Sequence, residues 1–295
     1  MEIFIQLFAS GLLTGAVYAL MALGIVIIYK ASSVFNFAHG GIVALTAYLV
    51  WSLLVQFHLH AGLVVLFALV AMGLIAILVQ RFILHPLTGQ PVLAAVVATL
   101  ALSEVIAGLI TVLWPGPARV YPKVIPSRTI QIPFAVFTLE AVINFLICAL
   151  AFAVFMLFFQ KSKLGLTMRG TAEDHQLARS EGVRVQRIFV MAWFIAILMA
   201  AIGGVLMANM HGVNQEPLIA LGMKSLAVVI LGGMESILGA VLGGLAIGLL
   251  EALGAGYLDP IVGGGVEEVF PFVILLIVLL VKPYGLFGYQ RIDRV

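Results

Sequence analysis

Two acidic side chains, Glu104 and Glu251, lie inside long apolar stretches. Ionisable side chains are rare in such stretches, so these two are candidates for a functional role. A third, Glu235, interrupts another apolar stretch beside Gly232 and Gly233. A carboxylate at membrane depth is costly, so it must face protein, water or a bundle cavity, or be protonated. For Glu104 and Glu251, structural hydrogen bonding and the lining of a polar path both stay open.

A further polar break occurs at the start of an apolar segment, in Val34-Phe-Asn-Phe-Ala-His-Gly-Gly41. Its His39 alone is more typical of a hydrogen-bonded interface histidine than of a proton switch. If the chain encloses a translocation path, we expect the polar residues lining it to be Asn36, His39, Glu104, Glu235 and Glu251.

Several kinds of enzyme chemistry are excluded. No G-x-x-x-x-G-K-[ST] phosphate loop, H-E-x-x-H or G-x-S-x-G occurs, and the only cysteine is Cys148. The three aspartates are widely separated, so no paired magnesium site is expected. A membrane enzyme with Glu104 as acid or base would lack every partner residue. We therefore expect a transport protein, not an enzyme, with no cofactor or metal on this chain.

Composition places these residues in a membrane. Of the 295 residues, 63% are hydrophobic and 9% charged, against roughly 45–50% and about 25% in an ordinary globular chain. A soluble fold would lack the polar residues to coat its surface, which excludes a soluble enzyme and a nucleic-acid binder. The net charge of +2 says little about partners.

The gaps between charges predict an all-α, polytopic membrane helix bundle, one transmembrane domain over residues 1–295. About eight or nine membrane segments are expected. We place them at 4–29, 36–56, 61–80, 92–114, 138–160, 188–210, 225–234, 237–256 and 266–281. Because the run at 225–234 is only ten residues long, we expect a broken or re-entrant half-helix near 225–235.

Lysine and arginine predict the orientation, with the N-terminus outside and the C-terminus cytoplasmic. Eleven basic residues then fall inside: Lys30, Arg81, Lys161, Lys163, Arg169, Arg179, Arg184, Arg187, Lys282, Arg291 and Arg294. Four fall outside: Arg119, Lys123, Arg128 and Lys224. The segment 115–133, with five prolines, is expected to be a stiff external loop.

The longest polar segment, 161–187, holds nine of the 28 charges and is expected to be a cytoplasmic loop. Thr171 and Asp174 fit a capping box, and Gly182 stands where a C-terminal glycine belongs, so a helix is expected over Ala172–Glu181. So short a helix is marginal in water. Either a protein partner holds it, or the segment is a solvated connector.

Glycines spaced four apart predict tight helix packing, within the chain or between chains. The pairs are Gly11 with Gly15, Gly239 with Gly243, and Gly244 with Gly248.

Three motifs in this order resemble the LivH-type permeases of branched-chain amino acid ABC importers, over nearly the whole chain. They are Asn36-Phe-Ala-His-Gly40, the segment 168–182, and Gly232-Gly-Met-Glu-Ser-Ile-Leu-Gly-Ala-Val-Leu-Gly-Gly244. Gly41 departs from the family pattern, which often has an acidic residue there, and Glu235 stands where a glycine is more usual.

The resemblance implies a permease that moves branched-chain or related amino acids inward by alternating access in a bacterial inner membrane. Its implied partners are a homologous LivM-type permease, two cytoplasmic ATPases that carry ATP and magnesium, a periplasmic substrate-binding protein and membrane lipid. The resemblance also implies that the charged loop docks into an ATPase. Its expected coupling residues are Arg169, Gly170, Thr171, Glu173, Asp174, Leu177, Ala178, Arg179 and Gly182.

An alternative is a stand-alone, proton-coupled amino-acid transporter that uses Glu104 and Glu251. Against it, the hydropathy shows no inverted repeat.

Overall fold

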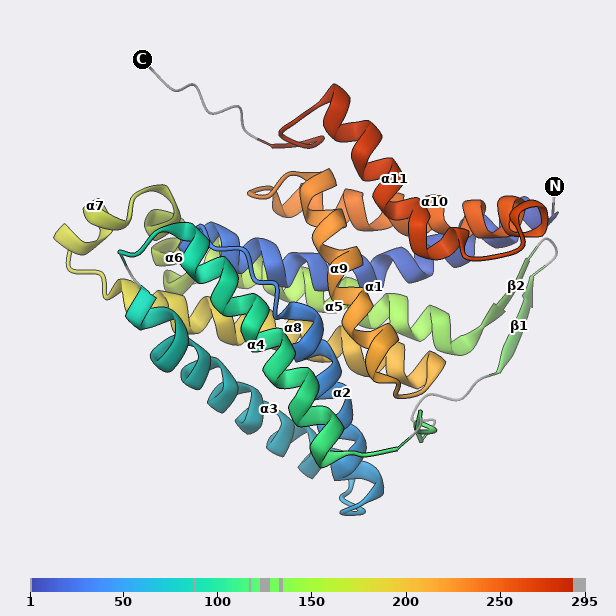
Figure 1. The fold of residues 1–295 in the computed structure, drawn as a ribbon, viewed down its shortest axis with the longest axis horizontal. Coiled ribbons are helices and arrows are strands. Elements are labelled where there is room, and N and C mark those ends of the chain that lie inside the picture. The colour runs from blue at the N-terminus through green and yellow to red at the C-terminus, as the bar shows by residue number, and fades with distance from the viewer. Residues whose placement is uncertain (1, 88, 117, 123–127, 133–134, 289–295) are drawn as a thin grey trace. The chain divides into compact units, whose positions relative to one another are not determined.

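Helices make up nearly all of the computed structural model, which describes residues 2–87, 89–116, 118–122, 128–132 and 135–288 (Figure 1). In chain order the elements are α1 (Glu2–Ser32), α2 (His39–Val55), α3 (Ala61–Leu78), the π-helix η1 (Val79–Leu84), the 3₁₀-helix η2 (His85–Leu87), α4 (Val92–Leu113), β1 (Thr129–Ile132), β2 (Ala135–Thr138), α5 (Leu139–Lys161), α6 (Lys163–Glu173), α7 (His175–Ser180), α8 (Val185–His211), α9 (Gln215–Gly232), α10 (Ile237–Val262) and α11 (Val266–Val281).

Seven helical segments of the described chain are long and apolar enough to cross a membrane: α1, α3 with η1 and η2, α4, α5, α8, α9 and α10. The helices α2, with 17 residues, and α11, with 16, are shorter. At about 1.5 Å per residue, even these two approach the thickness of the hydrocarbon layer. The prediction of an all-α polytopic membrane bundle is confirmed.

The expected half-helix near 225–235 is wrong. The apolar run is the C-terminal part of α9, an 18-residue helix that begins at Gln215. Lys224 lies within this helix and forms an ion pair with Glu251, so its charge does not end the membrane segment. A break does follow, because Gly233 adopts a positive φ of 101° and Ser236 caps the start of α10.

The segment predicted as an external loop contains regular structure. β1 and β2 form an antiparallel hairpin in which Thr129 pairs with Thr138 and Ile132 with Ala135. Lys123 lies outside the described residues, as do Pro117, Pro126 and Pro133. The stiff external segment expected over 115–133 therefore includes a strand, β1, near its C-terminal end, and its external position stays a prediction.

The chain divides into two compact units, residues 1–26, 125–149 and 224–295, and residues 27–124 and 150–223. The division falls within α1, α5 and α9. A single transmembrane domain stays a prediction.

In the second unit, α2 packs against both α4 and α8, and α3 packs against α8 (Figure 1). Small residues set the closest approaches. A Cβ on Gly204 of α8 would lie 2.7 Å from the carbonyl oxygen of Val43 in α2. A Cβ on Gly40 would overlap the backbone of Ile219 in α9. These contacts leave no room for a side chain between the helices.

In the first unit, α1 and α10 meet at the glycines that the spacing singled out. Gly11 and Gly15 lie against Gly248 and Gly244, and a Cβ on any of them would press on the facing backbone. Gly239 similarly faces Gly232 of α9. These glycines therefore lie at close helix contacts within this chain.

The α1–α10 contact predicts that adding one methyl group at a contact glycine lowers the stability of the protein. Gly248→Ala would force the backbone of Gly15 aside and should destabilise the protein by about 1–3 kcal/mol. Gly108→Ala is the control, because nothing lies within 4 Å of a Cβ there. Thermal unfolding in mild detergent measures both. Equal midpoints for the two variants would contradict the close packing.

Candidate functional site

The turn between α1 and α2 buries the first predicted pair of site residues. Asn36 and His39 are each 1% exposed. The Asn36 side-chain oxygen accepts a hydrogen bond from the Ala38 amide at 3.1 Å, which shapes the turn. The side-chain nitrogen of Asn36 has no hydrogen-bond partner among the described residues.

A threonine of α4 holds this turn in place. The Thr99 hydroxyl accepts from the Phe37 amide at 3.3 Å and lies 3.2 Å from the Phe35 carbonyl oxygen. Thr99 is fully buried. The polar turn is therefore enclosed between α4 and, through Gly40, the start of α9.

Glu104 lies on the opposite side of α4 and is exposed, together with Leu100 and Val105. It thus faces out of its own unit. An ionised glutamate in the middle of a membrane span is costly in lipid. Its carboxyl group must therefore meet a partner protein or water, or be protonated.

Glu251 has a different environment, inside the first unit. Its Oε1 lies 2.5 Å from Lys224 Nζ and accepts a hydrogen bond from the Tyr18 hydroxyl at 3.1 Å. The two charged side chains are only 12% and 5% exposed. One cluster therefore joins α9, α10 and α1, and we name these three side chains the buried triad.

Sequence reasoning missed the cation of the buried triad. Lys224 was assigned to an external loop because it precedes a short apolar run, and its partner lies 27 residues away along the chain. The one available signal was that Lys224 and Glu251 are both isolated charges in apolar surroundings, which implies that they pair. Glu235 is exposed in the turn between α9 and α10.

The charged loop is helical, but with different boundaries from those predicted. The expected helix Ala172–Glu181 is instead split between α6 and α7 at Asp174. Thr171 is not a cap, because it is fully buried within α6. Asp174 is the cap, and its side chain accepts from the Gln176 amide at 2.7 Å and the Leu177 amide at 3.0 Å.

The C-terminal end of α7 is as predicted. Gly182 adopts a positive φ of 82°. Its amide donates to the Arg179 carbonyl, and the Val183 amide donates to that of Ala178, each at 3.0 Å. This is a Schellman motif. Leu177 projects from the capped helix and is 61% exposed, whereas Ala178 is buried.

Three other residues of the expected coupling set, Arg169, Gly170 and Glu173, lie in α6. The Arg169 guanidinium donates to the Phe159 carbonyl of α5, and it lies over the Phe159 ring. Gly170 has open space around its Cα. Arg169 therefore attaches α6 to the end of α5. The loop helices α6 and α7 both present exposed apolar side chains, Leu164 and Leu166 from α6 and Leu177 from α7.

In the second unit, aromatic side chains lie near the C-terminal ends of α2, α4 and α8. Arg119 and Val213 exchange two backbone hydrogen bonds of 2.9 Å, and the Arg119 guanidinium lies 4.6 Å from the centroid of the Trp51 ring. Trp114 donates to Ser52. Burial raises the pKa of the Tyr121 hydroxyl. The segments after α4 and after α8 therefore end on the same side.

The comparisons with known proteins decide the family. The family described as "Branched-chain amino acid transport system / permease component" matches residues 7–281. The chain belongs to this family. It is 28% identical to the permease LivH of Salmonella typhimurium, over 99% of this chain and 98% of the relative. It is 27% identical to the permease BraD of Pseudomonas aeruginosa, with the same coverage.

A solved structure shows a similar fold. The structure of PsaBC from Streptococcus pneumoniae in complex with Fab matches with a TM-score of 0.51 and covers 94% of this permease and 92% of that chain. The two sequences are 14% identical.

The buried triad predicts strong coupling between its two charges. Lys224→Met leaves the Glu251 carboxylate buried without its cation and should cost about 3–5 kcal/mol of stability. The double variant Lys224→Met/Glu251→Gln should regain most of this, because glutamine is neutral and still accepts from Tyr18.

Unfolding midpoints in detergent compare the wild type, the single variants Lys224→Met and Glu251→Gln, and the double variant, with Lys282→Met as a control that removes an exposed cation. Additive losses in the double variant would show that the two side chains do not interact.

Proposed function

We propose that this permease is the membrane subunit of an ATP-binding-cassette importer that moves branched-chain or related amino acids into the cell by alternating access. The observation that carries the proposal is the family match over residues 7–281. Relatives named as high-affinity branched-chain amino acid transport permeases cover nearly the whole chain. ATP hydrolysis then belongs to separate subunits, and this chain is not an enzyme.

The proposed partners are a second, LivM-type permease, two cytoplasmic ATPases and a periplasmic substrate-binding protein. The proposed location is a bacterial inner membrane, with the N-terminus outside and the C-terminus cytoplasmic. The structure supports this orientation in two ways. First, Lys224 lies within a membrane helix and not in an external loop, so it no longer counts as an outside residue. Eleven basic residues then lie inside and three outside. The segments around Arg119 and Val213, both placed outside, are hydrogen-bonded to each other.

Coupling to ATP hydrolysis is assigned to α7. Its six residues cannot form a stable helix alone, and the Asp174 cap and Schellman motif fix its ends. Leu177 is an apolar side chain exposed on a charged loop, which suits a contact with another protein. ATP-driven closure of the ATPases would move α7 as a rigid body.

The coupling assignment predicts that Leu177→Asp abolishes substrate-stimulated ATP hydrolysis and co-purification of the ATPases. Membrane insertion should be unchanged, because the side chain is exposed and the caps do not use it. Val120→Asp is the control, at an apolar residue that is 88% exposed on the proposed external side. Normal hydrolysis in the Leu177 variant would overturn the assignment.

We propose that Glu104 lines the water-filled translocation path, and that this path lies where α4 contacts the second permease. Its exposure on a membrane span supports this role, because a lipid-facing carboxylate costs about 2.5–3.5 kcal/mol. For Asn36, His39, Glu235 and Glu251, lining of the path stays a prediction. The buried triad gives Glu251 a structural partner, so nothing favours the proton-coupled alternative.

Thiol labelling tests the environment of Glu104. In the assembled importer, a membrane-impermeant reagent should label Glu104→Cys and spare Val105→Cys, which lies at nearly the same depth but about 100° around the helix. The native Cys148 is buried and gives little background. Equal labelling at the two positions would contradict a path on the Glu104 side.

A further inference from the structure

The segment that follows α11 folds back over the turn between α9 and α10, within the first unit. The Leu286 amide donates to the Leu231 carbonyl at 2.8 Å, and the Phe287 amide donates to the Gly232 carbonyl at 3.1 Å. We name residues 284–288 the C-terminal strap. We propose that the strap holds this turn closed throughout the transport cycle, so that the break between the two helices is not a gate. The transport cycle rests on the proposed function, whereas the closed turn does not.

Glycines let the backbones of the strap and of α9 meet. Gly285 is buried, and a Cβ on it would overlap the Ile230 carbonyl oxygen and lie 2.8 Å from the Gly233 nitrogen. A Cβ on Gly233 would in turn lie 2.5 Å from the Gly288 nitrogen. Closely packed backbone does not deform continuously. The strap therefore cannot slide over the end of α9 while these contacts are kept.

The strap also supplies hydrogen-bond donors that the end of α9 lacks. The last carbonyl groups of a helix have no partner within it. α9 ends at Gly232, and the chain turns at once because Gly233 adopts a positive φ. The strap amides satisfy the carbonyls of Leu231 and Gly232. Because an unpaired carbonyl beside the membrane interior is costly, opening of the strap is disfavoured.

The start of α10 completes the contact. A Cβ on Gly239 would overlap the Gly232 carbonyl oxygen, so α9 and α10 touch through backbone beside the strap. The Ser236 hydroxyl caps α10 by accepting from the Gly239 amide at 2.9 Å. In transporters with broken helices, freed backbone carbonyls coordinate a coupling ion. Here two carbonyls at the break accept from the strap instead, so the turn cannot serve in that way while the strap is in place.

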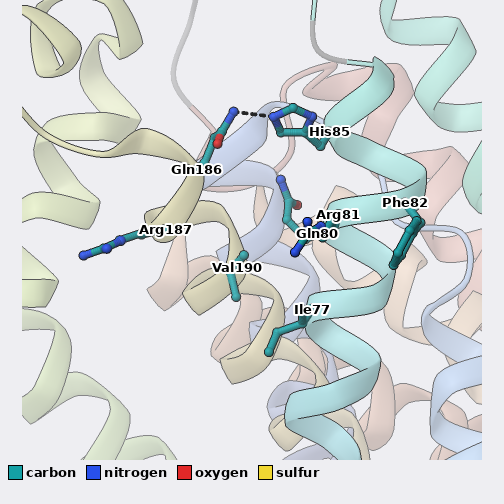
Figure 2. Close-up of a pocket in the computed structure, with 8 residues that line it drawn as sticks. All are labelled: Ile77, Gln80, Arg81, Phe82, His85, Gln186, Arg187 and Val190. Carbon is teal, nitrogen blue, oxygen red and sulfur yellow. Dashed lines mark hydrogen bonds between the residues drawn. The ribbon is translucent and has the colours of Figure 1, made fainter.

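A contact in the second unit shows the contrast. His85 of η2 and Gln186 of α8 are joined through side chains, with ring and amide nitrogens 2.5 Å apart, beside a pocket of about 650 Å³ (Figure 2). Side chains next to open space can change rotamer without any movement of the backbone. The contacts of the strap join backbone to backbone, so the strap should move with α9 and α10 as one body.

Hydrogen–deuterium exchange of the purified permease in mild detergent, read by mass spectrometry, tests whether the strap is closed. The amides of Leu286 and Phe287 should exchange about a hundredfold more slowly than in an unstructured peptide of the same sequence. The Gly233 amide, which donates to the Val229 carbonyl at 2.9 Å, should be similarly protected. Strap amides that exchange as fast as those of the free peptide would overturn the proposal.

Two glycine variants test the backbone contact. Gly285→Ala and Gly264→Ala both place an alanine at a positive φ, of 79° and 106°. Only the first adds a Cβ against the backbone of α9, because nothing lies within 4 Å of a Cβ at Gly264. Gly285→Ala should speed exchange of the strap amides about tenfold, and Gly264→Ala should leave it unchanged. Equal effects of the two variants would contradict the contact.

A chain that ends at Lys282 provides a second route if Gly285→Ala does not fold. Without the strap, the Gly233 and Ser236 amides of the turn should exchange about tenfold faster. Unchanged rates at these two amides would show that the strap does not hold the turn.

Vanadate trapping of the ATPases tests whether the strap stays closed during the cycle. Exchange of the strap amides should be the same in the trapped and the nucleotide-free importer. Faster exchange after trapping would make the turn a gate and overturn the proposal. If no ATPase accompanies the permease, the proposed function fails, and exchange in the purified permease still decides whether the strap is closed.

Discussion

The hydrocarbon interior of a membrane cannot hydrate a charge or a backbone amide, and this constraint decides how the helices of this permease associate. Nearly every backbone group is satisfied within a helix. Side chains that carry charge at membrane depth must then find partners in the protein. Lys224 and Glu251 do so in the buried triad, which also fixes α9 on α10 and α1 through Tyr18.

Close backbone contact is the second consequence, because hydrophobic attraction does not draw helices together in lipid. Glycine faces glycine where α1 meets α10, and Gly40 lies against α9. These contacts bring polar elements into the interior. The Asn36 turn is buried because α4 supplies Thr99 on one side and α9 approaches at Gly40 on the other.

The sequence predicted the membrane segments well, because long apolar runs have few alternatives to spanning helices. The four-residue spacing of glycines indicated close helix contacts, because it places small residues on one face of a helix. It failed where the deciding partner lies far away in the chain. Lys224 looked like a loop residue because its pairing with Glu251 is invisible in a linear pattern. Thr171 and Asp174 both fit cap positions, and only the burial of Thr171 within α6 selects Asp174. The β1–β2 hairpin was missed because prolines and short strands resemble a loop.

The central claim is that this chain works only as one permease within an ATP-driven importer. Purification of the tagged protein from its native membrane in mild detergent, followed by mass spectrometry of what accompanies it, tests this most directly. The account predicts two ATPases and a second, homologous permease in stoichiometric amounts. A folded chain that is recovered alone, and that transports without ATP after reconstitution, would contradict it.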